Sequence, residues 1–357
     1  RWNWEWDRER YPGLDGAIER LGAEGVRFLG YLNPYVAAGR SLFVEAAARG
    51  YLAKDGSGAD YLVDFGEFTA GIVDFTNPAA FAWYKGVIGR NLLGLGLSGW
   101  MADFGEYLPT DAVLASGESA EVAHNEWPVL WARCNREAVE ESGRGDILWF
   151  MRAGGPGSQR SCPMMWAGDQ NVDWSRDDGL PSVITAALSL GLSGHGLSHA
   201  DIGGYTTLFG MRRTKELLLR WTELAALSPL MRGHEGNRPA RNWQFDSDGE
   251  TLAAFARIDD RCVGPDDGRV RLHEQHRNGR RGRTDLANVV HVVEPDAEDP
   301  PRDDGREQLD VGERHPLAGP VEGFERRAAQ GLEMRLVEQA SVAGVRRRAI
   351  AEDVHGE

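Results

Sequence analysis

The chain has 357 residues, of which 41% are hydrophobic, and a formal net charge of −15 at pH 7. This length suits one large α/β barrel or two smaller domains, and no apolar run reaches the roughly 20 residues of a membrane span. The acidic total argues against nucleic acid as a partner, because its phosphates would be repelled. Three widely spaced cysteines form no zinc or disulfide pattern, and they favour a cytoplasmic location.

Helical and strand patterns alternate along residues 1–258, which is typical of a parallel α/β sheet. In chain order, the predicted elements are a helix over residues 11–23, a strand over 25–32, a helix over 77–95, a strand over 97–102, a helix over 121–141, a strand over 146–151, a helix over 180–192, a strand over 194–198 and a helix over 208–227. Two of these helices carry start signals. Pro12 is expected in the first turn of its helix, and Asn77 followed by Pro78 is an N-cap with proline at the first position.

The recurring unit is an apolar strand that ends in a polar or acidic residue, followed by a loop and a helix. This pattern predicts an α/β fold of the (β/α)8 TIM-barrel type, in which catalytic groups gather at the C-terminal ends of the strands. We count about six such units instead of eight. The barrel is therefore expected to be incomplete, lacking N-terminal strands and its C-terminal end.

The composition changes after residue 258. All twelve tryptophans and all three lysines precede this point, and Phe324 is the one aromatic residue after it. A segment with so few large apolar groups cannot offset its ordering entropy, so residues 259–357 are predicted to be disordered. Their arginine-rich composition resembles a frameshifted translation of GC-rich coding sequence, and a basic interaction arm is the alternative. We therefore assign residues 1–258 to a partial catalytic barrel and residues 259–357 to an unrelated tail.

Two carboxylates stand where predicted strands end among aromatic residues. Asp103 lies in the segment Trp-Met-Ala-Asp-Phe-Gly-Glu, and Asp169 in Trp-Ala-Gly-Asp-Gln. Two such groups can face each other across a sugar, one attacking the anomeric carbon and the other protonating the leaving oxygen. The apolar wall of Trp166 and Met165 would raise the pKa of the second group by desolvation. A helix cap or a salt-bridge partner is the alternative for either carboxylate.

These motifs resemble glycoside hydrolase family 31 and, within it, the enzymes that release sulfoquinovose, a 6-sulfonated glucose. The resemblance runs from residue 2 to about residue 257 and stops abruptly beyond residue 258. The matching segments are residues 2–6, 30–36, 73–78, 100–111, 124–131, 151–154, 164–174, 194–207 and 231–239.

The resemblance implies a retaining α-glycosidase with Asp103 as nucleophile and Asp169 as general acid/base, without a metal or an organic cofactor. It implies that Arg152 lines the sugar subsite and that His234 bonds a ring hydroxyl. A buried ion pair and a core histidine are the alternatives for these two residues. Glu106 either tunes the nucleophile or is an ordinary carboxylate at a helix N-terminus.

The resemblance also implies a sulfonate site made by an arginine, Trp2 and Tyr205, with the arginine placed before Arg1. Indole N–H and phenol O–H groups can donate to a sulfonate, which only accepts hydrogen bonds. Asp201 is expected either to shape the subsite or to support a glycine turn.

The implied partner is a small sulfosugar glycoside, of the sulfoquinovosyl glycerol or diacylglycerol type, and no oligomeric state is predicted. An α-glucosidase or α-xylosidase and a catalytically inactive truncated chain are the alternatives.

Overall fold

The computed structural model describes residues 2–208, 210–262 and 291–293. Of the predicted tail over residues 259–357, residues 259–262 and 291–293 belong to described elements. The rest of the tail lies outside the described residues. The domain division at residue 258 and the disorder of the tail therefore stay predictions.

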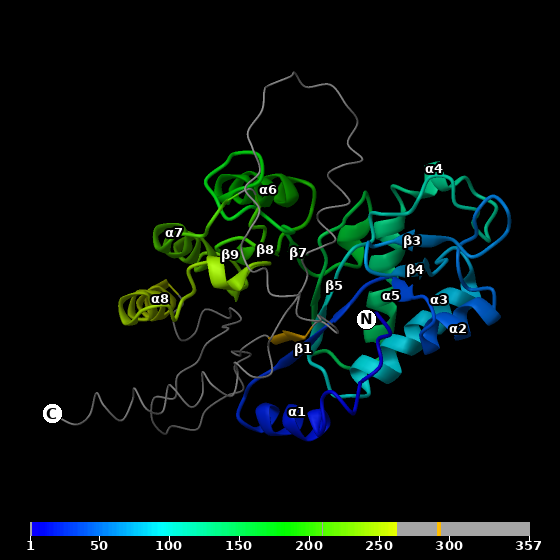
Figure 1. The fold of residues 1–357 in the computed structure, drawn as a ribbon, viewed down its shortest axis with the longest axis horizontal. Helices are drawn as coiled ribbons and strands as arrows, with labels where there is room; N and C mark the ends of the chain where they lie inside the picture. The colour runs from blue at the N-terminus through cyan, green and yellow to red at the C-terminus, as the bar shows by residue number, and fades with distance from the viewer. Residues whose placement is uncertain (1, 209, 263–290, 294–357) are drawn as a thin grey trace, which may run out of the picture.

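A parallel sheet with the strand order β11-β1-β5-β6 lies at the centre of the molecule (Figure 1). It comprises β1 (Phe28–Leu32), β5 (Gly99–Ala102), β6 (Leu148–Phe150) and β11 (His291–Val293). Every residue of β1 and β5 is buried, as expected for apolar strands covered on both faces. Strand β5 pairs with β1 through Gly99 and Leu29 and with β6 through Met101 and Phe150. Since these strands are parallel, their C-terminal ends share one edge, and Asp103 follows β5 there.

Four shorter strands continue the parallel arrangement as two separate pairs. They are β7 (Met165–Trp166), β8 (Ser198–His199), β9 (Asp201–Ile202) and β10 (Arg232–Gly233). Strand β7 pairs with β8, β9 pairs with β10, and a parallel bridge from Met151 to Met165 connects the end of β6 to β7. The α/β class is as predicted. Among the described residues the pairs do not join into a closed ring, so the incomplete eight-stranded barrel stays a prediction.

All the helices predicted within residues 1–258 are present, some of them with different bounds, whereas a possible short helix around residues 321–342 lies outside the described residues. The α-helices are α1 (Leu14–Ala23), α2 (Ser41–Ala48), α3 (Pro78–Val87), α4 (Ala120–Ala123), α5 (Trp127–Ser142), α6 (Leu180–Leu192), α7 (Lys215–Ala225) and α8 (Gly249–Cys262). A π-helix, η1 (Ile88–Leu93), extends α3, and two 3₁₀-helices are η2 (Ser158–Arg160) and η3 (Pro239–Arg241).

The start of α3 is as predicted, whereas the start of α1 is not. The Asn77 side chain accepts hydrogen bonds from the backbone N–H groups of Ala79 (2.9 Å) and Ala80 (3.4 Å). The prediction that Pro12 lies in the first turn of a helix is wrong. Gly13 has a left-handed φ of 73°, which right-handed helical geometry does not allow, so α1 begins after it.

Three other predicted extents are wrong. The helix predicted over residues 121–141 is divided into α4 and α5, and Pro128 lies in the first turn of α5, a position that favours a new start. The helix predicted from residue 208 begins only at α7, because the Thr214 hydroxyl accepts a hydrogen bond from the Leu217 N–H (3.2 Å). The strand predicted over residues 194–198 becomes β8, at residues 198 and 199.

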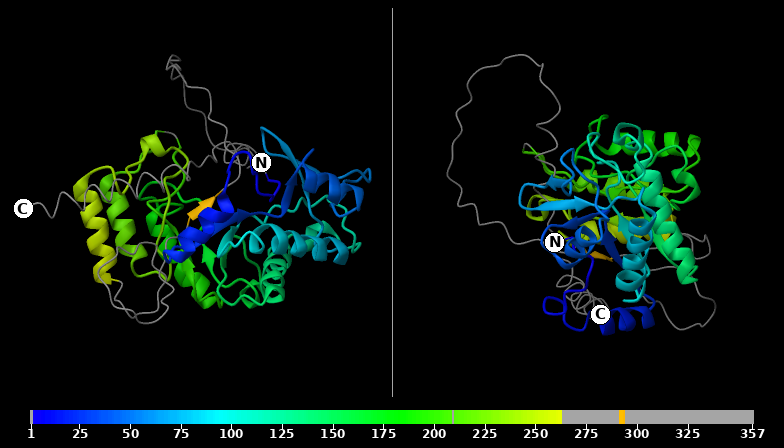
Figure 2. Two further views of the ribbon diagram at one scale, coloured as in Figure 1. Left: turned by 90° about the horizontal axis from the view of Figure 1, so that it is seen from below. Right: turned by 90° about the vertical axis from the view of Figure 1, so that its right-hand side faces the viewer.

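The part of the chain between β1 and α3 forms a small antiparallel sheet that was not predicted. It has the order β2-β4-β3 and comprises β2 (Tyr35–Ala37), β3 (Leu62–Asp64) and β4 (Thr69–Ile72). These strands have three or four residues, which is too short for an alternating pattern to stand out. Figures 1 and 2 show this sheet and α2 at one end of the molecule, with α7 and α8 side by side at the other.

A core rich in tryptophan fixes the strand that carries Asp103. The largest fully buried side chains include Trp100, Trp127, Trp131, Trp149 and Trp221. The Trp100 indole, on β5, donates to the Asn135 side chain on α5 (2.8 Å), so this buried polar group is satisfied. No helix in the described part of the chain is long and apolar enough to cross a membrane.

Candidate active site

Asp103 is held firmly at the end of β5, with only 2% of its surface exposed. The Tyr31 hydroxyl donates to Oδ2 (2.6 Å), and the backbone N–H of Phe104 donates to Oδ1 (2.8 Å). The backbone then turns sharply, since Phe104 has a φ of 55° and Gly105 a φ of 107°. A Cβ atom at Gly105 would lie 2.8 Å from the Trp131 ring, so this turn requires glycine.

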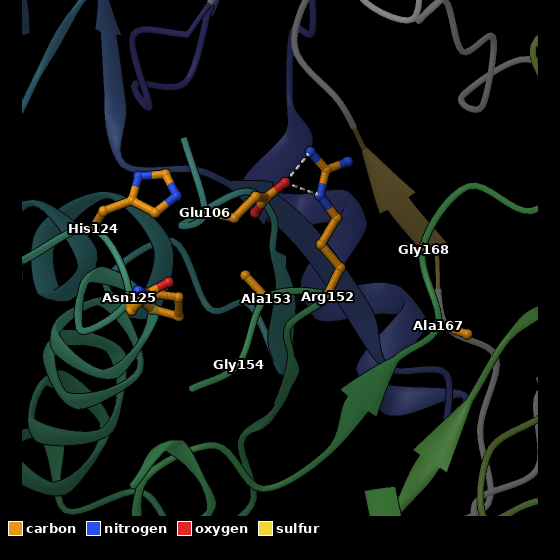
Figure 3. Close-up of a pocket in the computed structure, with 9 residues that line it drawn as sticks. Glu106, His124, Asn125, Arg152, Ala153, Gly154, Ala167 and Gly168 are labelled. Atoms are coloured by element: carbon orange, nitrogen blue, oxygen red, sulfur yellow. Dashed lines mark hydrogen bonds and ion pairs between the residues drawn. The ribbon is translucent and has the colours of Figure 1, made fainter. Parts of the chain in front are cut away.

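Arg152, in the loop after β6, joins three carboxylates. Its Nε lies 3.2 Å from Asp103 Oδ1, its Nη2 lies 2.7 Å from Glu106 Oε1, and its Nη1 lies 3.7 Å from Asp169 Oδ2. The guanidinium also stacks over the Phe104 ring at 4.4 Å. Figure 3 shows its two contacts with Glu106. The structure therefore brings the predicted nucleophile, the predicted acid/base and the predicted subsite arginine into one cluster.

Asp169 lies in surroundings that favour its protonated form. Burial raises the pKa of this carboxyl to about 7; the positive charge of Arg152 opposes the shift, and the negative charge of Asp103 adds to it. The side chain keeps 29% of its surface exposed, so a substrate can reach it. An acid with a pKa near 7 can both hold and release a proton at neutral pH, as a general acid/base must.

Glu106 is part of the carboxylate cluster and does not begin a helix. The interpretation as a helix N-terminal carboxylate is therefore wrong. Burial raises the pKa of this carboxyl, and Arg152 opposes that shift. Among the described residues, its Oε2 atom has no hydrogen-bond partner.

His234 and Tyr205 form a second group of predicted site residues, next to the acid/base loop. Their rings meet edge to face at 4.9 Å, and the backbone N–H of Tyr205 donates to the Gln170 carbonyl (2.8 Å). The backbone N–H of Gly236 donates to His234 Nδ1 (2.9 Å), so the neutral ring carries its hydrogen on Nε2. Burial, reinforced by the charges of Arg232 and Arg213, holds the pKa of His234 well below its usual value. His234 is therefore a hydrogen-bond donor through Nε2.

Trp2 belongs to an aromatic group that includes Phe104. Its ring lies 4.5 Å from Phe65, 5.0 Å from Phe68 and 5.4 Å from Phe104. Phe104 also stacks with Arg152, so Trp2 is one ring away from the carboxylate cluster. Among the ring contacts between described residues, none connects Trp2 directly to Tyr205.

Asp201 is fully buried beneath the site. Its Oδ1 accepts a hydrogen bond from the Trp166 indole (2.9 Å) and pairs with Arg232. Burial raises the pKa of Asp201 to about 6, against the opposing charge of Arg232. Asp201 therefore holds the Trp166 indole in place. Trp166 is the last residue of β7 and lies three residues before Asp169.

Two residues of the site were missed from the sequence. Tyr31 stands within an apolar run that reads as a buried strand, and Arg232 begins the Arg-Gly-His-Glu-Gly segment around His234, but neither residue was given a role. Both reach their partners across neighbouring strands, so only strand pairing could have identified them. Among the residues that the structure describes, no cluster of His, Cys, Asp and Glu could hold a metal ion.

A cavity of about 410 Å³ opens beside this cluster (Figure 3). Glu106 and Arg152 line it together with His124, Asn125 and Gly168. Its walls come from the loops that follow β5, β6 and β7 and from the start of α5. The cavity therefore lies at the C-terminal edge of the strands, where the carboxylates are.

The model of the glycosyl hydrolases family 31 TIM-barrel domain matches residues 1–259. The chain is 65% identical over 258 residues to a sulfoquinovosidase of Escherichia coli K12 and 55% identical over 259 residues to one of Agrobacterium fabrum C58. Each match covers 72% of this chain, which spans 38% of the first relative's length and 39% of the second's.

A solved family 31 sulfoquinovosidase from E. rectale, in complex with an aza-sugar inhibitor, matches with a TM-score of 0.71 and 56% identity. That match covers 72% of this chain and 39% of the solved one. Sequence and fold agree, and the chain belongs to glycosyl hydrolase family 31 and carries that family's TIM-barrel domain.

Proposed function

We propose that this chain supplies the catalytic carboxylates of a retaining α-glycoside hydrolase that cleaves α-sulfoquinovosides. The observation that carries the proposal is the cluster around Arg152. Its guanidinium makes ionic contacts with both Asp103 and Asp169, and the pKa of Asp169 is raised to about 7. A nucleophile and a protonated acid within reach of one cation are the groups that a double displacement needs.

In the first step, the Asp103 carboxylate attacks the anomeric carbon while the bond from that carbon to the leaving oxygen breaks. Asp169 gives its proton to this oxygen, and a covalent glycosyl-enzyme remains. In the second step, Asp169 removes a proton from water, the water oxygen attacks the anomeric carbon, and the Asp103 carboxylate is released. Two inversions leave the configuration retained.

Electrostatics lets Asp169 change from acid to base between the two steps. While Asp103 is ionised, its charge raises the pKa of Asp169, so the proton is held. Once Asp103 is esterified that charge is gone, and Arg152 then favours the ionised form of Asp169. The same pair of contacts therefore supports both steps.

For the substrate, the proposal rests on the similarity to the two sulfoquinovosidases reported above and on Trp2, Tyr205 and His234. We assign the indole and phenol groups to the sulfonate and the His234 Nε2–H to a ring hydroxyl. Asp201 supports Trp166 from below, and the site requires no metal or organic cofactor. We also propose a cytoplasmic location, because Cys134 and Cys162 are buried free thiols.

The test is the release of a chromogenic aryl group from an α-sulfoquinovoside and from the matching α-glucoside, with Asp103→Asn as control. We expect release from the sulfonated substrate alone and none from the variant. A preference for the glucoside would favour an α-glucosidase or α-xylosidase, and α-xylosidases at 32% and 30% identity are among the relatives. No release by a chain that circular dichroism shows to be folded would mean that this polypeptide is inactive.

A further inference from the structure

The cavity beside Glu106 and Arg152 has no assigned ligand. We propose, as an extension of the proposed function on which it rests, that this cavity receives the leaving group of the glycoside. We further propose that His124 selects a neutral, hydroxylated leaving group by accepting a hydrogen bond from one of its hydroxyls.

The position of the cavity follows from the chemistry of the acid/base. Gly168 lines the cavity and directly precedes Asp169. Since Asp169 must protonate the leaving oxygen, the leaving group has to lie beside this segment. Arg152, which also lines the cavity, contacts both carboxylates, so the cavity borders the reacting centre. Trp2 and Tyr205 do not line it, which leaves the sulfonate end of the sugar elsewhere.

His124 presents an unused acceptor to this cavity. Its Nδ1 lies 2.6 Å from the Leu108 carbonyl oxygen, which can only accept, so Nδ1 carries the hydrogen. In the neutral ring Nε2 is therefore an acceptor, and the hydrogen bond of this side chain within the described part of the chain is the one through Nδ1. The bond to Leu108 also fixes the ring, and Figure 3 shows His124 and Gly168 on opposite sides of the cavity.

The remaining walls determine the class of leaving group. Asp103 and Glu106 already offset the charge of Arg152 while Asp169 holds its proton, so an anionic leaving group would meet excess negative charge. The apolar part of the lining is limited to Pro128 and two alanines, which offers little surface for an acyl chain. The exposed Asn125 amide can bind a second hydroxyl. A polyol such as glycerol, or a sugar, fits this chemistry.

The variant His124→Asn distinguishes the roles of the two ring nitrogens. An asparagine amide can replace the Nδ1–H donor at the Leu108 carbonyl, but it has no acceptor at the position of Nε2. We compare the kcat/KM values for glyceryl and propyl α-sulfoquinovosides, whose leaving groups have the same carbon chain and differ by two hydroxyls. The wild-type chain should prefer the glyceryl substrate. The variant should lose about tenfold on this substrate, the worth of one hydrogen bond, and keep its rate on the propyl one.

Val122→Ala, at a side chain on α4 that is 58% exposed and outside the cavity, is the matched control and should change neither rate. Equal losses on both substrates, or no loss on either, would overturn the role of His124. Aryl glycoside turnover in the same preparations tests the proposed function separately. If the aryl substrate is not cleaved, calorimetric titration of the chain with the two alkyl glycosides decides: a preference for the glyceryl glycoside that needs His124 supports the subsite, and equal binding refutes it.

Discussion

Replacing Asp169 with asparagine should stabilise the fold more at pH 8 than at pH 5. The pKa of this carboxyl rises from the ordinary value of 3.8 to about 7 on folding, mainly through burial. The folded chain therefore binds this proton more tightly than the unfolded chain does, and stability falls as the pH rises from about 4 to about 7. Asparagine has no proton to lose, so Asp169→Asn removes the penalty that builds up from about pH 4 and is complete above about pH 7.

The size of the effect follows from the same values. Between pH 5 and pH 8, the wild-type chain loses stability over the two pH units from pH 5 to the folded pKa of about 7. At about 1.4 kcal/mol per unit, the largest possible loss is about 2.7 kcal/mol. Because 29% of the side chain is exposed, solvent screens part of this, and we expect about 1 kcal/mol. For a chain of 357 residues that corresponds to a difference of about 1–2 °C in melting temperature.

The assay is thermal unfolding of wild type and variant, followed by circular dichroism at both pH values. Asp55→Asn is the control, because its exposed carboxyl has a lowered pKa through its hydrogen bonds with Ser57. Both its folded and its unfolded pKa lie below pH 5, so its effect should be equal at pH 5 and pH 8. If Asp169→Asn also shifts the melting temperature equally at both pH values, the buried, proton-holding environment assigned to Asp169 is refuted.

Three other predictions follow from the site. Tyr31→Phe removes a donor from the buried Asp103 carboxylate and should lower kcat/KM by about 10- to 100-fold in steady-state assays; a change below twofold would contradict its role. The kcat/KM profile should fall as the pH rises through about 7, and Asp201→Asn should move this fall to lower pH, because the charge of Asp201 raises the pKa of Asp169. Gly105→Ala should destabilise the fold by about 1–3 kcal/mol in urea unfolding, through its left-handed φ and its contact with a core tryptophan, and unchanged stability would refute that strain.

Some features of this protein are decided locally, and the sequence was enough to predict them. Asn77 and Pro78 define the start of α3 through backbone groups two or three residues away. The apolar run before Asp103 is a strand because its residues suit a sheet buried on both faces. The (β/α) alternation, the two carboxylates and the family followed from such short segments.

Local patterns failed where neighbouring segments decided the outcome. The strands of the β2-β4-β3 sheet are too short to give a pattern of their own. Glu106 was a possible helix start by its position, yet its side chain is held by Arg152 from the loop after β6. The predicted tail lies largely outside the described residues, and its disorder stays a prediction.

The sequence by itself determined which side chains could do chemistry, and the tertiary structure decided how they do it. The hydroxyl of Tyr31 reaches Asp103 because β1 and β5 pair in parallel. Arg152 lies between Asp103 and Asp169 because β5, β6 and β7 end at one edge. The pKa of Asp169 depends on how much solvent the packed chain excludes, and on charges brought near it by other strands. These are distances between residues far apart in the chain, which only the folded backbone fixes.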